Sequence, residues 1–324
     1  MKLLKLVPET TNIEFTKWRS LAMGISLLLI IGSIALVAVR GLNLGVDFVG
    51  GQMVRVTFSQ PVHLDELRDT VNALGQGDAT IQQFGSPTDV SIRMPLPAGG
   101  EGAANAAANK LKAAVEAKYP GVKFGSVDTV SGKVSGELFR TGAIAMGLAM
   151  IAISIYIWFR FEWQFGFGSL FALVHDVSLT FGFFALTQLE FDLNSVAAVL
   201  TIIGYSLNDT IVVYDRIREN LRKYRKMEIV PLLDLSINET LARTIMTSLT
   251  MIIALVCLLI WGPEVIFGFT AAMLLGIFVG TYSSIYMAAP MLVWLKVGPH
   301  SFVPKEAAAA KGAERMGPAG GAQP

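Results

Sequence analysis

Two carboxylic acids stand in stretches of this sequence that are otherwise almost wholly apolar. Asp209 follows Asn208 in GYSLNDTIVVYDRIREN, and Asp176 follows His175 in ALVHDVSLTFG. A charged side chain at the centre of a membrane helix costs about 2.5–3.5 kcal/mol on insertion scales. Ionisable groups that carry this cost are typical of proton relays, because a carboxyl group takes up and releases protons. We therefore take these four residues as candidates for proton transfer within a membrane.

A basic residue, Arg243, also lies next to an apolar stretch. Arg243, Thr247 and Thr250 share one helical face, because they are spaced at i, i+4 and i+7. Two interpretations stay open for the arginine. It can extend along its aliphatic stem to the lipid headgroups, or it can act on an acid inside the membrane.

The two acids also allow different interpretations. Asp209 is too short to reach the headgroups, which favours a functional role. His175 and Asp176 are neighbours, so they can form a relay or satisfy each other as a structural pair inside a helix bundle.

Composition places the chain in the membrane class. Hydrophobic residues make up 53% of its 324 residues, charged residues only 16%, and the mean hydropathy is +0.55. The net charge of +1 gives no basic field for a nucleic acid partner. The single cysteine, Cys257, excludes an internal disulfide and a Cys-x-x-Cys site, and no ATP-binding loop motif occurs. We expect no metal, no cofactor and no bond-making enzyme chemistry.

Six stretches are long enough to cross a bilayer, which takes roughly 20 mostly apolar residues. They are residues 18–39, 138–159, 165–188, 194–214, 243–262 and 266–295. The expected organisation is an N-terminus and first span over 1–39, an external domain over 40–137, a five-span bundle over 138–295 with a cytoplasmic loop at 215–242, and a disordered cytoplasmic tail over 296–324. The fold class is therefore membrane α-helical, with six transmembrane helices.

Lys and Arg residues predict the orientation of these spans. They gather before the first span, at Arg160, in the 215–242 segment and in the tail, whereas the segment near 188–193 carries only the acids Glu190 and Asp192. With six spans, every basic segment falls on one side of the membrane. Both termini are thus expected in the cytoplasm, and residues 40–137 outside it.

The external segment carries alternating strand and helix patterns. A strand is expected around Val54, Val56 and Phe58, and a helix from His63 to Leu74 that ends at Gly75. Two short extended runs, an alanine-rich helix and a last strand follow, near residues 79–84, 89–94, 103–118 and 122–130. The order β-α-β-β-α-β predicts a ferredoxin-like α+β domain.

Small residues recur at every fourth position of the sixth span, at Ala272, Gly276, Gly280 and Ser284. Such a row lets another helix approach closely, so we expect helix packing here. The partner helix can belong to this chain or to another subunit.

Five segments, in order along the chain, resemble the SecF family of the bacterial accessory Sec translocase, within the RND superfamily of proton-driven transporters. They are GLNLGVDFVGG, VSGEL, ALVHDVSLTFG, GYSLNDTIVVYDRIREN and NETLARTIMTSLT, at residues 41–51, 134–138, 172–182, 204–220 and 238–250. The resemblance covers nearly the whole chain apart from the tail. It implies half of a twelve-span RND unit, with the external domain between helices one and two.

The resemblance assigns roles to particular residues. Asp209 and Arg243 fall on the positions tied in the family to proton conduction and protein export. Asn208 can orient Asp209, and Arg243 can stabilise its charged form by a charge-assisted hydrogen bond. The motif with Gly45, Asp47, Gly50 and Gly51 is structural in the family or couples the external domain to the membrane; Val49 departs there from the small or polar residues that are common.

The resemblance also implies partners and a location. SecD would supply the second half of the unit across a pseudo-twofold axis. The other partners are the SecYEG channel and the translocating preprotein, with YajC and YidC as further candidates, in the bacterial cytoplasmic (inner) membrane. The implied function is use of the proton motive force to enhance preprotein translocation. Two alternatives stay open: an RND-like proton-coupled transporter of small molecules or lipids, and a passive subunit that stabilises the translocon.

Overall fold

The computed structural model describes residue 8 and residues 11–75, 77, 79–84 and 86–298. The predicted disordered tail lies, from residue 299 onward, outside the described residues. Within the described part, six helical segments are long and apolar enough to span a membrane. They are η1 with α1 (Phe15–Trp18, Arg19–Arg40), α5 (Gly132–Arg160), α6 (Trp163–Thr187), α7 (Leu193–Lys223), α8 (Ile229–Trp261), and α9 (Phe267–Ser283) continued by η3 (Ser284–Ala288) and α10 (Ala289–Trp294). The predicted six-helix membrane fold is confirmed.

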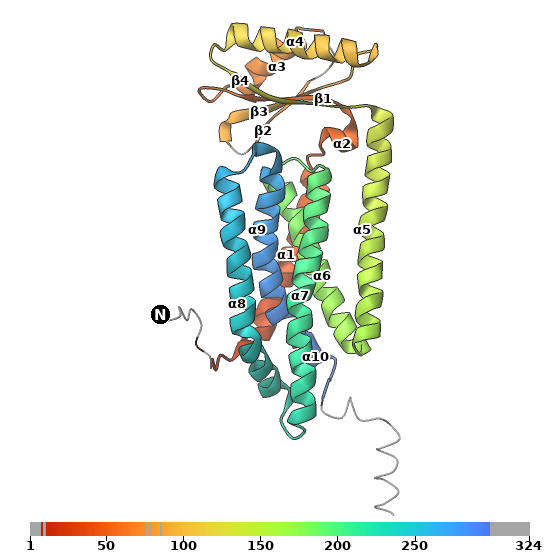
Figure 1. Cartoon of the computed structure of the whole chain (residues 1–324), viewed down its shortest axis with the longest axis vertical. Helices are drawn as coiled ribbons and strands as arrows, with labels where there is room; N and C mark the ends of the chain where they lie inside the picture. Colours follow the sequence, from red (N-terminus) through yellow and green to blue (C-terminus); the bar gives the residue numbers. More distant parts are fainter. Residues whose placement is uncertain (1–7, 9–10, 76, 78, 85, 299–324) are drawn as a thin grey trace, which may run out of the picture.

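Three of these helices form the interior of the bundle. In the most apolar stretches of α6, α7 and of the last segment, 44%, 56% and 56% of the residues are buried, against 11% in α5. Helix α5 stands to one side of the others in Figure 1. The two candidate acids, Asp176 and Asp209, lie on α6 and α7, in the part of the bundle that is most enclosed by protein.

The external domain sits on one end of the bundle (Figure 1). A short helix, α2 (Val46–Val49), leads from α1 into it. Its elements are β1 (Gly51–Thr57), α3 (Leu64–Asn72), β2 (Thr80–Phe84), β3 (Ser86–Met94), α4 (Gly100–Lys118) and β4 (Lys123–Val130). The four strands pair antiparallel in the order β2-β3-β1-β4, which is the ferredoxin-like arrangement predicted from the sequence.

The core of this domain lies between the sheet and its two helices. Alternate residues of β1 and β3, such as Val54 and Ile92, are fully buried against Leu67 of α3 and Leu111 of α4. Both helices cover the sheet face that points away from the bundle, with α4 outermost in Figure 1. The opposite face is thereby left to meet the membrane-spanning part.

The segment 215–242, which the sequence analysis treats as a loop, is mostly helical. Helix α7 continues to Lys223 and α8 already begins at Ile229, so only residues 224–228 connect them. Some charged residues of this segment pair with one another: Arg216 donates to Glu239 at 2.7 Å and to Glu219 at 2.6 Å. Helices that project beyond the apolar layer stay amphipathic, and hydrophobicity alone therefore ends them too early.

The earlier start of α8 changes the position of Arg243 within its helix. Since α8 begins at Ile229, Arg243 lies inside a helix and not at its start. The connection between α7 and α8 lies at the end of the molecule opposite the external domain (Figure 1).

Candidate functional site

The carboxylate of Asp176 is held by three helices. Both Asp176 and His175 are fully buried. The Nδ1 atom of His175 lies 2.8 Å from one carboxylate oxygen. The other oxygen accepts hydrogen bonds from Ser206 of α7 and from Ser283 of α9, the latter at 2.8 Å. Asp176 therefore lies inside the bundle against α7, where it links α6, α7 and α9.

One atom of this cluster lacks a partner. The Nε2 atom of His175 is buried without a hydrogen bond among the described residues. The imidazole ring lies beside the Tyr282 ring, with 6.0 Å between the centroids. This nitrogen can donate or accept a further hydrogen bond, depending on the tautomer of the ring, so His175 and Asp176 do not use all of their hydrogen-bonding capacity on each other.

The carboxylate of Asp209 has a different environment. The residue is only 2% exposed, and its Oδ2 atom is buried with no hydrogen-bond partner in the described chain. Ser206, the residue that contacts Asp176, lies one turn earlier on the same face of α7. A buried carboxylate oxygen without a donor is costly for a structural group, and it is expected for a group that binds a proton.

The two residues predicted to act directly on Asp209 do not contact it. Asn208 and Arg243 are both exposed, and no hydrogen bond or ion pair joins either side chain to Asp209 in the described chain. The predicted charge-assisted hydrogen bond is therefore absent. Arg243 points to the outer surface of α8, although its charge is near enough to act on the Asp209 carboxyl.

Hydroxyl groups connect α7, α8 and α9. The Tyr205 hydroxyl lies 2.9 Å from Ser248, and Ser248 lies 2.9 Å from Thr281. Thr281 and Ser283 belong to the run TYSS, which is polar within an otherwise apolar span. That run was the available signal, but which hydroxyl meets which acid depends on how the helices pack.

The row of small residues in α9 packs against α7 of the same chain. A methyl group added at Gly276 would collide with Ile202, and one at Gly280 would lie 3.0 Å from the Cβ of Ser206. Ala272 and Ser284 are fully buried as well. Close approach of α9 brings Ser283 to Asp176, so this packing builds the polar cluster.

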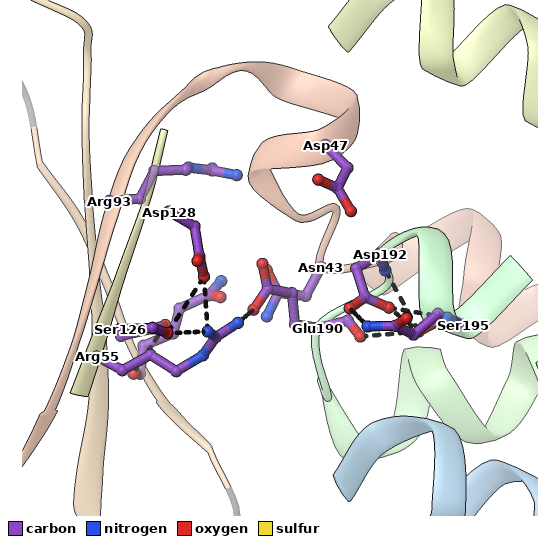
Figure 2. Close-up of polar contacts among 12 residues, drawn as sticks. Asn43, Asp47, Arg55, Arg93, Ser126, Asp128, Glu190, Asp192 and Ser195 are labelled. Carbon is purple, nitrogen blue, oxygen red and sulfur yellow. Dashed lines mark hydrogen bonds and ion pairs between the residues drawn. The ribbon is translucent and has the colours of Figure 1, made fainter. Parts of the chain in front are cut away.

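The motif before β1 joins the external domain to the outer end of the bundle (Figure 2). The Gly45 amide donates to the Phe191 carbonyl at 3.0 Å, and the Phe191 amide donates to the Asn43 carbonyl at 2.7 Å. Asp47 accepts from the Leu193 amide at the first turn of α7, at 3.0 Å. Residues before the domain thus pair with the segment between α6 and α7.

Different constraints require glycine at the three glycine positions of this motif. Gly50 and Gly51 have φ angles of 76° and 113°, a region that favours glycine. A side chain at Gly51 would also come within 2.8 Å of the Met94 carbonyl. At Gly45 the reason is space, because a methyl group there would lie 2.6 Å from a carboxylate oxygen of Glu190.

Among the described residues, no group of His, Cys, Asp and Glu side chains is arranged to hold a metal ion.

Comparisons with known proteins point to a single family. Residues 110–298 match the family model "Protein export membrane protein SecD/SecF, C-terminal", and residues 35–62 match the "SecD/SecF GG Motif". Protein translocase subunit SecF of Rhodobacter capsulatus is 44% identical over 304 residues, which cover 90% of this chain and 91% of that protein. The SecF subunit of Rickettsia rickettsii is 43% identical over 292 residues, covering 89% and 94%.

Two solved structures are also similar. The crystal structure of SecDF from Thermus thermophilus, described as a translocon-associated membrane protein, matches with a TM-score of 0.81 and 33% identity over 90% of this chain. SecDF in a super-membrane-facing form matches with a TM-score of 0.61 and 31% identity over 96% of this chain. The chain spans only 40% and 41% of these two longer SecDF chains.

Proposed function

Because this chain belongs to the SecD/SecF family of protein-export membrane proteins, we propose that it works with SecD to turn the proton motive force into enhanced preprotein translocation through SecYEG. The family itself rests on the comparisons above. Proton coupling and the partners are the proposal, and they rest on the intramembrane site.

One observation carries the proposal: Asn208 of α7 and Arg243 of α8 are exposed, and neither side chain has a hydrogen-bond or ion-pair partner in the described chain. Thr247 and Thr250 of α8 are exposed as well, although they bond to carbonyls of their own helix, and one carboxylate oxygen of Asp209 is buried without a partner. Lipid tails cannot satisfy such groups, and polar residues in membrane helices turn toward protein or water-filled cavities. These exposed positions therefore suit contact with a second membrane subunit. SecD is the fitting partner, since the similar SecDF chains extend well beyond the length of this one.

In the proposed mechanism, Asp209 binds a proton from the external side and releases it to the cytoplasm. Loss of the negative charge removes its attraction to Arg243, so α7 and α8 shift relative to each other or to SecD. An elementary charge that crosses 100 mV yields about 2.3 kcal/mol, which is enough to bias a conformational equilibrium. Ser206, one turn away, would pass the movement to the Asp176 cluster.

The protein is a multi-pass protein of the bacterial inner membrane, as expected for its family. We propose that both termini face the cytoplasm, because the Lys and Arg residues gather at the bundle end away from the external domain. Reporter fusions at Gly100 and at Arg225 should report opposite sides, external and cytoplasmic respectively. Reports from the same side would contradict the proposed topology.

The test of the function is Asp209→Asn, measured together with SecD in sealed membrane vesicles. The asparagine keeps the shape of the side chain but cannot ionise, so we expect proton flux and proton-driven export to be lost. Asp215→Asn is the matched control, because Asp215 lies on the same helix but is exposed and paired with Arg160 at 3.1 Å. Wild-type flux and export in Asp209→Asn would instead favour the passive-subunit function.

A further inference from the structure

A second acidic side chain, Glu190, is enclosed where the external domain meets the bundle. Glu190 lies between α6 and α7, and its side chain is 21% exposed. It lies 3.3 Å from Arg55 of β1, which belongs to the external domain. Arg55 also pairs with Asp128 of β4 at 2.6 Å and donates to Ser126 at 2.8 Å (Figure 2). One guanidinium is thus shared between a carboxylate of the domain and one of the bundle.

The charges around Glu190 are mainly negative. Asp192 in the same segment and Asp128 on β4 both act on it. Asp47 of α2 is engaged by the Leu193 amide, and Arg93 of β3 by the Leu44 carbonyl at 2.7 Å. The described side chains from the start of α9 are apolar ones, such as Phe267 and Phe269. Arg55 is therefore the cation that faces Glu190, and it is held more closely by another acid.

Burial is the largest single influence on Glu190 and raises its pKa above the ordinary value of 4.5, although Arg55 acts in the opposite direction. Asp192 and Asp128 raise this pKa further. A cavity of about 40 Å³ lies beside the carboxyl group, lined from the domain by Arg55 and Ser91 and from the bundle by Leu189 and Phe267. A water molecule needs roughly 10–15 Å³, so there is room for one to bring a proton.

We propose that Glu190 is a proton-binding site outside the membrane-spanning segments, and that a proton held there stabilises the external domain on the end of the bundle. Separation of the domain would return Glu190 to water and remove the cover of Arg55 and Ser91. The docked arrangement then binds the proton more tightly than the separated one. By linkage, falling external pH favours docking, and rising pH loosens the domain.

This effect of pH on docking is opposite to that expected of a simple ion pair between the domain and the bundle, which is here called an ion-pair latch. In a latch, protonation of Glu190 would break its pair with Arg55 and release the domain. Here Arg55 keeps Asp128 at 2.6 Å after Glu190 is neutralised, so no cation is left stranded. Neutralisation also removes repulsion between Glu190 and the carboxylates of Asp128 and Asp192.

The site deepens the proposed function and rests on it for its role in export. Its segment joins α6, which carries Asp176, to α7, which carries Asp209. Asp192 caps α7 by accepting from the Ser195 amide at 2.8 Å, so the segment is tied to that helix. At 1.5 Å per residue, Asp209 lies about 24 Å along α7 from its first residue. Because α7 joins the two sites, we expect the coupling between them to act through movement of this helix.

The test measures the position of the domain at controlled pH. Spin labels are placed on Lys110→Cys of α4 and Leu186→Cys of α6, both exposed positions, in a Cys257→Ala background. The labelled chain is assembled with cysteine-free SecD in lipid nanodiscs. Distance distributions are recorded by pulsed electron paramagnetic resonance at pH 5.5 and pH 8.5.

We expect a narrow distribution at pH 5.5 and a broader or longer one at pH 8.5. Glu190→Gln, which imitates the protonated acid, should stay narrow at both pH values. Glu190→Asp should keep the pH response, since it retains an ionisable group in the segment between α6 and α7. Asp128→Asn should weaken the response, because Arg55 then has no other carboxylate when Glu190 is protonated. A broad distribution for Glu190→Gln at both pH values would establish the ion-pair latch instead, and an unchanged pH response in this variant would also overturn the proposal.

Failure of the proposed function can be told apart from failure of this site. Asp209→Asn carrying the same labels should retain the pH-dependent distances, because Glu190 is intact. If the distances follow Glu190 while Asp209→Asn exports like the wild type, the proton site stands and the proton-driven function falls. If Asp209→Asn abolishes export while the distances ignore Glu190, the function stands and the site falls.

Discussion

Asp176 and Asp209 are both buried acids on neighbouring helices, but their surroundings differ in every polar contact. Asp176 is joined to His175 and accepts from hydroxyl groups of two other helices. Asp209 keeps a buried oxygen without any donor among the described residues. The first acid holds three helices together in the chain as it stands. The second is incomplete without a proton or a partner subunit, and the same type of residue therefore supports two different roles.

The largest effect expected from this contrast is on export in Asp209→Asn. No hydrogen bond of the buried oxygen is lost, so the thermal unfolding of the purified chain should match that of the wild type. Proton-driven export should nevertheless disappear. A large drop in unfolding temperature would place Asp209 with the structural acids and remove the contrast.

Asp176→Leu, in contrast to Asp209→Asn, should lower the stability of the chain. It deletes the interhelical hydrogen bonds from Ser206 and Ser283, each worth about 0.6–1.7 kcal/mol in membrane proteins. We expect the free energy of unfolding to fall by about that amount per bond, measured by denaturant titration in detergent micelles. Unchanged stability would show that these contacts do not hold the bundle.

Gly276→Ala tests whether close packing of α9 builds the Asp176 cluster. The added methyl group collides with Ile202, and overpacking costs typically about 1–3 kcal/mol. Gly204→Ala is the matched control, because Gly204 is exposed on α7 with open space around it. Unfolding of both variants in detergent should show a loss of stability for Gly276→Ala alone; equal stability of the two would mean that α9 can move away from α7 without cost.

Arg243→Lys should have the smallest effect. Arg243 is exposed and forms no ion pair in the described chain, so unfolding of the isolated protein should not change. Export in vesicles with SecD should fall only in part, because an ammonium group keeps the charge but not the fork of a guanidinium. Complete loss of export would show that the guanidinium geometry itself is needed, and full activity would mean that charge alone suffices.

The membrane fold and the positions of its unusual acids can be predicted from the sequence. Six apolar stretches, the strand and helix pattern of the external domain, and the two carboxylates inside apolar runs are local properties of the chain. Each follows from hydrophobicity or periodicity within a few turns, and the confirmed six helices and β2-β3-β1-β4 sheet reflect this. The helical ends of 215–242 were missed because their amphipathic, charged residues imitate a loop.

Which polar groups contact one another depends on how the helices and strands pack. Ser283 is 107 residues from Asp176, and Glu190 is 135 residues from Arg55, so no local pattern links them. The packing also separates Arg243 from direct contact with Asp209, since the side chain turns to the outer face of α8. The physical reason is that burial and hydrogen bonding depend on the rotation of each helix about its axis and on its distance from its neighbours. These are fixed by packing such as that of Gly276 against Ile202, and so the sequence located both acids while the fold assigned their partners.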